Sequence, residues 1–180
     1  MLNTNRLPTL SALAKVAAAE RDVDVVTYAP DSLRAAQEKL AGLRAEMEAQ
    51  ENKSSLTRNY DLTARLAGQA AEAAAKSVED AVAAKRQVRD EAAALLSSMS
   101  ETILEFDRKI YAARRVRGIT LDFAALTRTS QQIRVDLGDA QKDFDAGAFA
   151  AAHAKAMALQ VHISSAEETI SEAMLLAKKR

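Results

Sequence analysis

The stretch from Asn59 to Arg117 constrains the fold most, because nothing in it stops a helix. It contains no proline and a single glycine, Gly68, and a lone glycine costs a helix only about 1 kcal/mol. The pattern predicts one continuous helix over residues 59–117, because its apolar and small residues recur at close to 3.6 residues, the period of a straight helix. The stripe consists of Leu66, Ala70, Ala73, Ser77, Ala81, Ala84, Val88, Ala92, Leu95, Met99, Ile103, Phe106, Ile110 and Ala113.

Four shorter helices are expected around this one. The first begins near Pro8, carries Leu10, Leu13 and Ala17 on one face, and ends before residues 25–30. Pro30 then starts a second helix, which a polar loop over residues 50–59 ends. The turn at residues 145–148 separates the last two helices. Three apolar seams spaced by three and four residues mark these elements: Leu33, Ala36, Leu40, Leu43 and Met47; Leu126, Ser130, Ile133, Leu137, Ala140 and Phe144; Phe149, Ala152, Ala156, Leu159, Ile163, Ala166, Ile170 and Ala173.

Composition supports an all-α class and excludes several kinds of function. The 180 residues include 5 Gly and 2 Pro, and many of the hydrophobic residues are alanine. The 25 acidic and 25 basic residues balance, so no overall field favours nucleic acid or an anionic membrane. The absence of cysteine excludes disulfides and thiolate chemistry. No apolar run is long enough for a transmembrane segment, and residues 1–10 lack the features of a signal peptide.

The two halves of the chain resemble each other. A shift of 93 residues matches Leu13 with Phe106, Val23 with Val116, Val26 with Ile119, Thr27 with Thr120, Leu33 with Leu126 and Leu40 with Ile133. Beyond the loop a shift of 89 matches Tyr60 with Phe149, Thr63 with Ala152 and Ala67 with Ala156. We therefore predict a tandem repeat of two three-helix units, 1–98 and 99–180, joined by the long helix in an elongated, spectrin-like arrangement. The alternative is a single antiparallel helical bundle.

Residues 10–100 carry a resemblance to a known family. The segments 28–43 and 59–74 resemble a bacterial family of unknown function found in cell-envelope and lipoprotein-linked proteins. The matching residues are Tyr28, Ala29, Pro30, Leu33, Ala36, Lys39 and Leu40, then Tyr60, Leu66, Ala67, Gln69 and Ala70. The second half departs from the pattern, with Leu121, Asp122 and Phe123 in place of Tyr-Ala-Pro. The resemblance implies a periplasmic or cell-envelope location, with the cytoplasm as the alternative, and implies no catalytic residues.

The two histidines, His153 and His162, give the main alternative function. They lie nine residues apart, so on one helix they point to roughly opposite sides and cannot share a metal ion. A solvated histidine on a helical bundle can act in phosphotransfer, but the Lys-Gly-Ser continuation typical of such sites does not follow His153. We expect both side chains to flank the core.

The remaining polar and aromatic candidates have structural explanations. The basic residues Arg108, Lys109, Arg114, Arg115 and Arg117 could bind phosphate groups, yet cations are also expected at a helix C-terminus. Glu167, Glu168 and Glu172 form no Glu-x-x-His pair, so a di-metal site is not expected. The glycines Gly42, Gly68, Gly118, Gly138 and Gly147 form no phosphate-binding loop. Tyr28, Tyr60, Phe106, Phe123, Phe144 and Phe149 are expected to fill the ends of the bundles, with a ligand cleft as the alternative.

These observations predict a protein that is not an enzyme, with no catalytic, cofactor or metal site. The favoured function is a coiled-coil-like scaffold or protein-interaction module. It would bind a protein partner, or itself, through helical faces, and it would bind no nucleic acid. A helical sensor or histidine phosphotransfer domain that uses His153 is the alternative.

Overall fold

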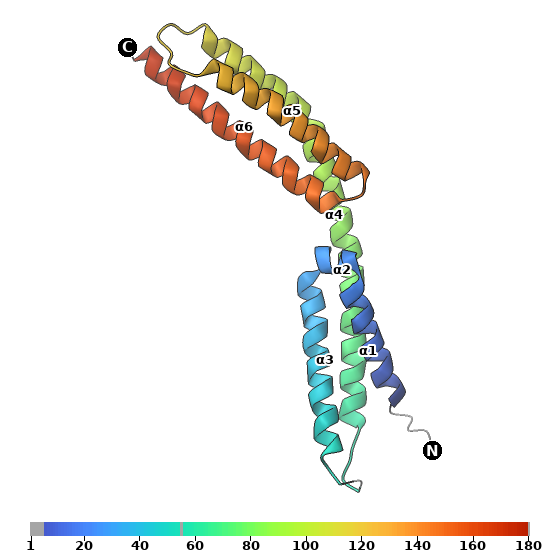
Figure 1. The fold of residues 1–180 in the computed structure, drawn as a ribbon. Coiled ribbons are helices and arrows are strands. Elements are labelled where there is room, and N and C mark those ends of the chain that lie inside the picture. Colours follow the sequence, from blue (N-terminus) through green and yellow to red (C-terminus); the bar gives the residue numbers. More distant parts are fainter. Residues whose placement is uncertain (1–5, 55, 180) are drawn as a thin grey trace. The chain divides into compact units, whose positions relative to one another are not determined.

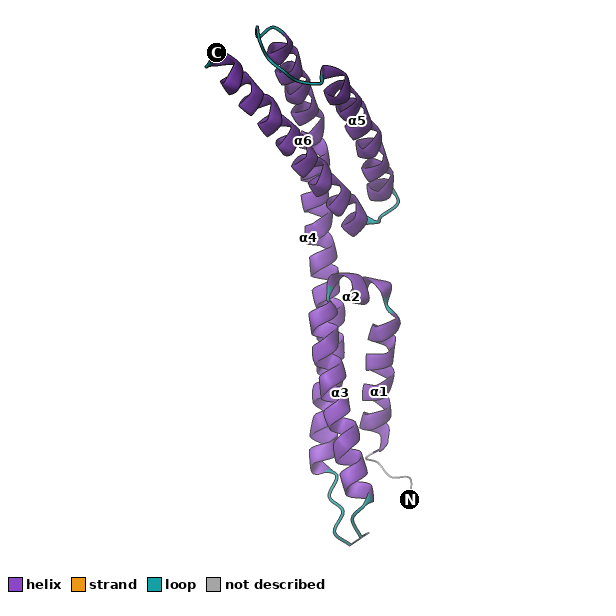
Figure 2. Ribbon diagram, turned by 60° about the vertical axis from the view of Figure 1, so that its left-hand side comes forward, coloured by secondary structure: helices purple, strands orange, loops and turns teal. Residues whose placement is uncertain are grey.

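The computed structural model describes residues 6–54 and 56–179, which form six helices and no strand (Figure 1). The all-α class is therefore confirmed. Short loops join the helices (Figure 2). Residues 1–5 of the N-terminal segment, Ser55 of the predicted loop and the terminal Arg180 lie outside the described residues. The helices are α1 (Arg6–Arg21), α2 (Val23–Tyr28), α3 (Pro30–Glu51), α4 (Asp61–Arg114), α5 (Phe123–Asp145) and α6 (Phe149–Lys178).

The long helix α4 has 54 residues and agrees with the predicted helix to within three residues at each end. Just before its first turn, the Asn59 side chain accepts a hydrogen bond from the backbone N–H of Asp61 at 2.8 Å. Just after its C-terminus the hydrogen bonds take the 3₁₀ pattern, since the N–H of Val116 donates to the carbonyl of Ala113, three residues earlier. The absence of helix-stopping residues therefore predicted this element correctly.

The segment before Pro30 differs from the prediction, which placed no helix there. Residues 23–28 form α2, because the Asp22 side chain accepts hydrogen bonds from the N–H groups of Asp24 and Val25 and caps the new helix. Ala29 leaves the helical region, as expected of a residue before proline, with φ −136° and ψ 48°. Pro30 then stands in the first turn of α3, as predicted.

The turn between α5 and α6 depends on Gly147, whose φ is +80°. The N–H of Gly147 donates to the carbonyl of Phe144, and the N–H of Ala148 donates to that of Asp143. This pair of bonds is a Schellman motif, which ends a helix with a residue in the left-handed region. Glycine adopts that region without a steric penalty, so the predicted turn at residues 145–148 has a clear local cause.

The chain divides into two compact units, Met1–Arg86 and Gln87–Arg180. Unit one contains α1, α2, α3 and residues 61–86 of α4, and in Figure 1 α1 and α3 lie alongside that part of α4. Its main core joins α1, α3 and α4, and most of the core residues are alanines. The buried residues are Ala12, Val16, Ala36, Leu40, Leu43, Ala67, Ala70 and Ala74. The predicted division between residues 98 and 99 stays a prediction.

The core face of α1 differs from the predicted one. Thr9, Ala12, Val16 and Ala19 are buried, whereas Leu10 is 60% exposed and Leu13 and Ala17 are only half-buried. Nearly every position from Ala12 to Ala19 is apolar, so the helix has no distinct polar side and its phase cannot be read from the spacing. The prediction was therefore displaced by one residue.

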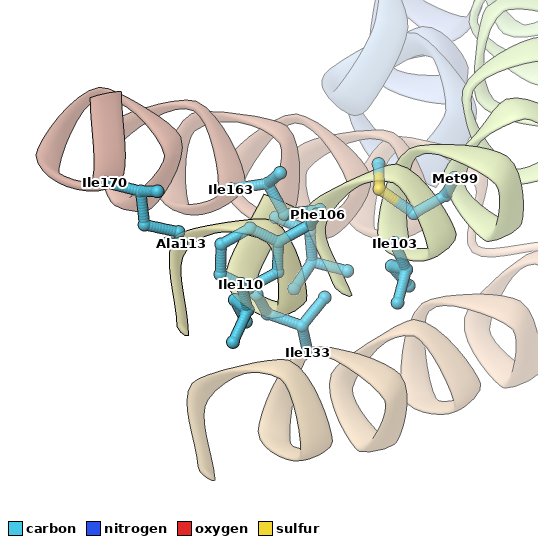
Figure 3. Close-up of a cluster of buried hydrophobic side chains, with 9 residues drawn as sticks. Met99, Ile103, Phe106, Ile110, Ala113, Ile133, Ile163 and Ile170 are labelled. Atoms are coloured by element: carbon cyan, nitrogen blue, oxygen red, sulfur yellow. The ribbon is translucent and has the colours of Figure 1, made fainter. Parts of the chain in front are cut away.

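Unit two has the larger core side chains. Phe106 of α4 is fully buried and packs between Ile163 of α6 and Ile133 of α5 (Figure 3). Met99, Ile103 and Ile110 continue the same face of α4. Every residue of the predicted α5 and α6 seams is buried or half-buried, so the spacing identified the core faces of both helices.

Candidate interaction surface

Within unit one, α4 carries a buried seam that holds the unit together. Thr63, Ala67, Ala70, Ala74, Ser77 and Ala81 are all at most 3% exposed. Their spacing alternates between four and three residues, as in a coiled coil. The Ser77 hydroxyl donates to the carbonyl of Ala74 at 2.8 Å, so a buried polar group is satisfied within the helix.

A second seam runs along α4 one residue further on at every position. It consists of Ala64, Gly68, Ala71, Ala75, Val78 and Val82, and we call it the outer seam. Gly68 and Ala75 are exposed, Val78 is 40% exposed and Val82 is 65% exposed. The alternation of four and three residues is the same as in the buried seam. The outer seam therefore has the pattern of a helix-packing face, but most of it is open to solvent.

Polar contacts fix the rotation of α4 and so keep the outer seam turned outward. Towards α2, the ammonium of Lys85 lies 2.7 Å from the Asp24 carboxylate and 6.0 Å from the centre of the Tyr28 ring. The hydrogen bond that the Lys85 ammonium donates to the Asp24 carboxylate raises the pKa of Lys85. The Lys85 side chain is 35% exposed, so its ammonium group is only partly solvated.

A second contact joins α4 to α3. The Ser32 hydroxyl donates to Asp80 at 2.6 Å, and Lys76 lies 3.0 Å from both oxygens of the same carboxylate. The bond from Ser32, followed by that from Lys76, lowers the pKa of Asp80. Because α4 is held from both sides, its outer seam is presented on a well-defined surface.

The histidines lie apart in unit two, in ordinary surface surroundings. His153 is 30% exposed, and its Nε2 is 3.6 Å from a carboxylate oxygen of Glu91. His162 is exposed and lines a shallow cavity of about 190 Å³ together with Asp136, Asp139 and Lys155. The structure therefore does not bring the two histidines together.

The acidic and histidine side chains lie dispersed over the part of the chain that the structure describes. Over residues 6–54 and 56–179, no three His, Asp or Glu side chains converge as a metal site would require. Of the acidic residues on α6, Glu167 pairs with Lys109 at 2.7 Å, while Glu168 and Glu172 are exposed. Among the described helices, none combines the length and apolar character needed to cross a bilayer.

The predicted basic cluster separates into two groups. Lys109 turns towards α6, where Glu167 neutralises it. Arg114 lies on the side of α5, with its guanidinium 5.5 Å from the Phe123 ring centre, whereas the Arg115 guanidinium is 4.4 Å from the ring centre of Tyr111 on α4. The remaining members, Arg108 and Arg117, are exposed.

Most of the aromatic residues lie at helix ends, as predicted. Phe144 at the end of α5 packs edge-to-face on Phe149 at the start of α6, with ring centres 5.2 Å apart. Phe123 starts α5, and Tyr60 directly precedes α4. Phe106 is the exception, because it lies inside α4 as the largest fully buried side chain among the described residues.

Comparison with known proteins identifies no relative. No family model matches the chain, and neither the curated proteins nor the solved structures contain a match. The envelope-family resemblance is therefore carried only by the residues named above.

The outer seam was not predicted from the sequence. Its signal is present there as the same alternation of four and three residues, offset by one residue from the buried seam. Because α4 is rich in alanine, both series consist mainly of apolar or small residues. The sequence pattern alone therefore does not show which of the two series is buried. Only the positions of α1 and α3 determine which series is covered.

Proposed function

We propose that the protein is a non-enzymatic helical scaffold that binds a protein partner through the outer seam of α4. The observation that carries this proposal is a helix with two apolar seams, of which one is buried within its own unit and the other is mostly open to solvent. Apolar faces with this spacing are surfaces onto which other helices pack. Alanine and glycine at most of its positions allow the backbone of a partner helix to approach closely.

We also propose that the two units are tandem copies of one three-helix design. Burial supports this proposal, because residues that lie 89 positions apart, one on α4 of unit one and the other on α6, are buried to a similar degree. Each core residue of α4 in unit one corresponds to a buried or half-buried residue of α6. The pairs are Thr63 with Ala152, Ala67 with Ala156, Ala70 with Leu159, Ala74 with Ile163, Ser77 with Ala166 and Ala81 with Ile170.

The first helices of the two units support the same relation with a small adjustment. Ala12 and Val16 on α1 are buried like Phe106 and Ile110 on α4, which lie 94 residues further on. The sequence comparison used 93 and matched half-buried Leu13 with fully buried Phe106. The one-residue difference equals the displacement found for the core face of α1.

A bacterial cell-envelope or periplasmic location belongs to this proposal and rests on the Tyr28-Ala29-Pro30 resemblance alone. Fractionation of cells that express the full-length gene tests it. Recovery with periplasmic markers is expected, and recovery with cytoplasmic markers would reject the envelope location without affecting the binding proposal.

The binding proposal is tested with two glutamate variants on neighbouring positions of α4. Val82→Glu places a charge in the outer seam, whereas Ala83→Glu places the same charge at an exposed position outside it. In affinity capture followed by quantitative mass spectrometry, a partner should be retained by the wild type and by Ala83→Glu and lost from Val82→Glu. Equal recovery with all three proteins would reject the outer seam as the binding surface.

The same experiment separates the scaffold from the phosphotransfer alternative. His153→Ala should leave partner capture unchanged, because His153 lies in unit two and outside the outer seam. Its contact with Glu91 puts a carboxylate close to the nitrogen that would carry a phosphoryl group, which disfavours that charge. Stable phosphate label on His153 would favour the alternative.

A further inference from the structure

A groove in unit two that contains two arginines is not used by the proposed scaffold function. It lies between α4 and α5 and has a volume of about 360 Å³. Its lining includes Tyr111 and Arg114 from α4 with Thr127, Gln131 and Arg134 from α5. Two of these five side chains are cationic and the other three carry polar groups, so hydrogen-bond donors line both walls, beside the apolar side chain of Ile110.

Arg114 is held in position by its surroundings. Its Nη2 donates to the Thr127 hydroxyl at 2.9 Å and lies 3.5 Å from the carbonyl of Phe123. The Thr127 hydroxyl in turn donates to that carbonyl at 2.8 Å. Both contacts use Nη2, which leaves the N–H groups of Nε and Nη1 for a ligand. A guanidinium fixed in this way loses little conformational entropy on binding.

The one acidic residue that lines the groove, among those described, is already neutralised. Asp107 accepts a hydrogen bond from the Ser130 hydroxyl at 2.6 Å through one oxygen and pairs with Arg134 through the other. The acid therefore holds Arg134 at the groove and has no oxygen left without a partner. The Asp107–Arg134 pair therefore has no net charge to repel an incoming anion, and Arg134 keeps further N–H groups that can donate to it.

A third arginine contacts Tyr111 of the groove lining without lining the groove itself. Arg115 stacks on the Tyr111 ring and donates to the Tyr111 hydroxyl, which leaves the phenolic proton free to donate into the groove. Within the lining, two guanidinium groups against one carboxylate leave one positive charge unbalanced, and Arg115 adds a further positive charge beside Tyr111. A phosphate group carries close to two negative charges at neutral pH and accepts several hydrogen bonds.

We propose that the α4–α5 groove of unit two binds a phosphate group. Arg114 and Arg134 supply charged N–H donors from the two walls, and Tyr111 and Gln131 supply neutral ones. Planar guanidinium groups suit phosphate because two N–H groups can bind two of its oxygens together. The phosphate is either a free anion or a group on a larger molecule, and the experiment distinguishes these sources. This inference does not depend on the scaffold proposal.

The test is a titration of the full-length protein with inorganic phosphate, followed by NMR at constant low ionic strength. The amide signals of Thr127 and Ser130 and the side-chain amide of Gln131 should shift together. Arg114→Gln should weaken binding about tenfold or more, since it removes a charge-assisted contact. The affinity of Arg114→Lys for phosphate should lie between those of the wild type and Arg114→Gln. Arg128→Gln changes an exposed residue of α5 outside the groove lining, and its affinity should stay within about twofold of the wild type. Unchanged circular dichroism spectra show that the variants fold.

The pH dependence gives an independent readout. Inorganic phosphate loses its second proton near neutral pH and a phosphoserine about one pH unit lower, so binding of inorganic phosphate should strengthen several-fold between pH 5.5 and 7.5, whereas binding of sulfate should change little. A phosphoserine peptide that binds more tightly than inorganic phosphate would indicate a protein-borne group, and equal affinities would indicate the free anion. Binding that Arg114→Gln leaves within twofold of wild type, or shifts confined to other surfaces, would overturn the proposal.

Discussion

Replacement of Ile163 by alanine tests the core of unit two most sharply. Ile163 is 1% exposed and packs in the cluster around Phe106. The change removes three buried carbon atoms at about 0.8 kcal/mol each, and the cavity left behind adds to that loss. We therefore expect the free energy of unfolding to fall by about 3 kcal/mol, within the range of roughly 2–5 kcal/mol seen for such substitutions.

Urea unfolding followed by far-ultraviolet circular dichroism measures this effect. With a slope of about 1–3 kcal/mol per molar urea, the midpoint for unit two should fall by about 1–3 M. Val161→Ala is the matched control, because Val161 lies two residues away on α6 and is 61% exposed. It should change the free energy by no more than about 0.5 kcal/mol. Equal midpoints for the two variants would refute the assignment of the α6 core face.

Three further predictions concern unit one and the arrangement of the units. Lys85→Ala should lower the urea midpoint at low salt and have a smaller effect in 1 M salt, as expected for a screened pair with Asp24. Because the Asp80 pKa is lowered in the folded state, wild-type stability should fall as the pH drops below about 4, and Asp80→Asn should weaken this dependence in urea midpoints at pH 7 and pH 3. If the tandem arrangement holds, small-angle scattering should give a radius of gyration well above the roughly 16 Å of a compact 180-residue globule. Ala93→Pro should then alter the scattering profile while most helix remains, whereas a globular wild-type profile would favour the single-bundle alternative.

The sequence predicted the helices where local chemistry determines them. Pro30 fixed the start of α3, Gly147 fixed the end of α5, and the absence of stop signals predicted α4. These features act within a few residues, so they can be recognised without knowledge of tertiary contacts. The seams of α5 and α6 were predictable for a related reason, because large side chains such as Ile133 and Ile163 mark one face clearly.

The features that were missed depend on tertiary packing or on a single capping residue. The helix α2 exists because Asp22 caps it, and aspartate occurs in many other contexts. The face of α1 was displaced because alanines surround the helix. The pairing of Lys85 with Asp24 joins residues 61 positions apart, and the groove around Arg114 requires the register of α4 against α5. No local pattern encodes these contacts.

The central claim is that the outer seam of α4 contacts a protein partner. A photo-crosslinking amino acid placed at Ala75, in the seam, tests this directly, with the same group at exposed Ala83 as the control. The claim predicts that irradiation yields a defined adduct from position 75 and little from position 83, either with a second protein or with another copy of the chain. Adducts of equal yield from both positions, or none from position 75 when a partner is captured, would contradict it.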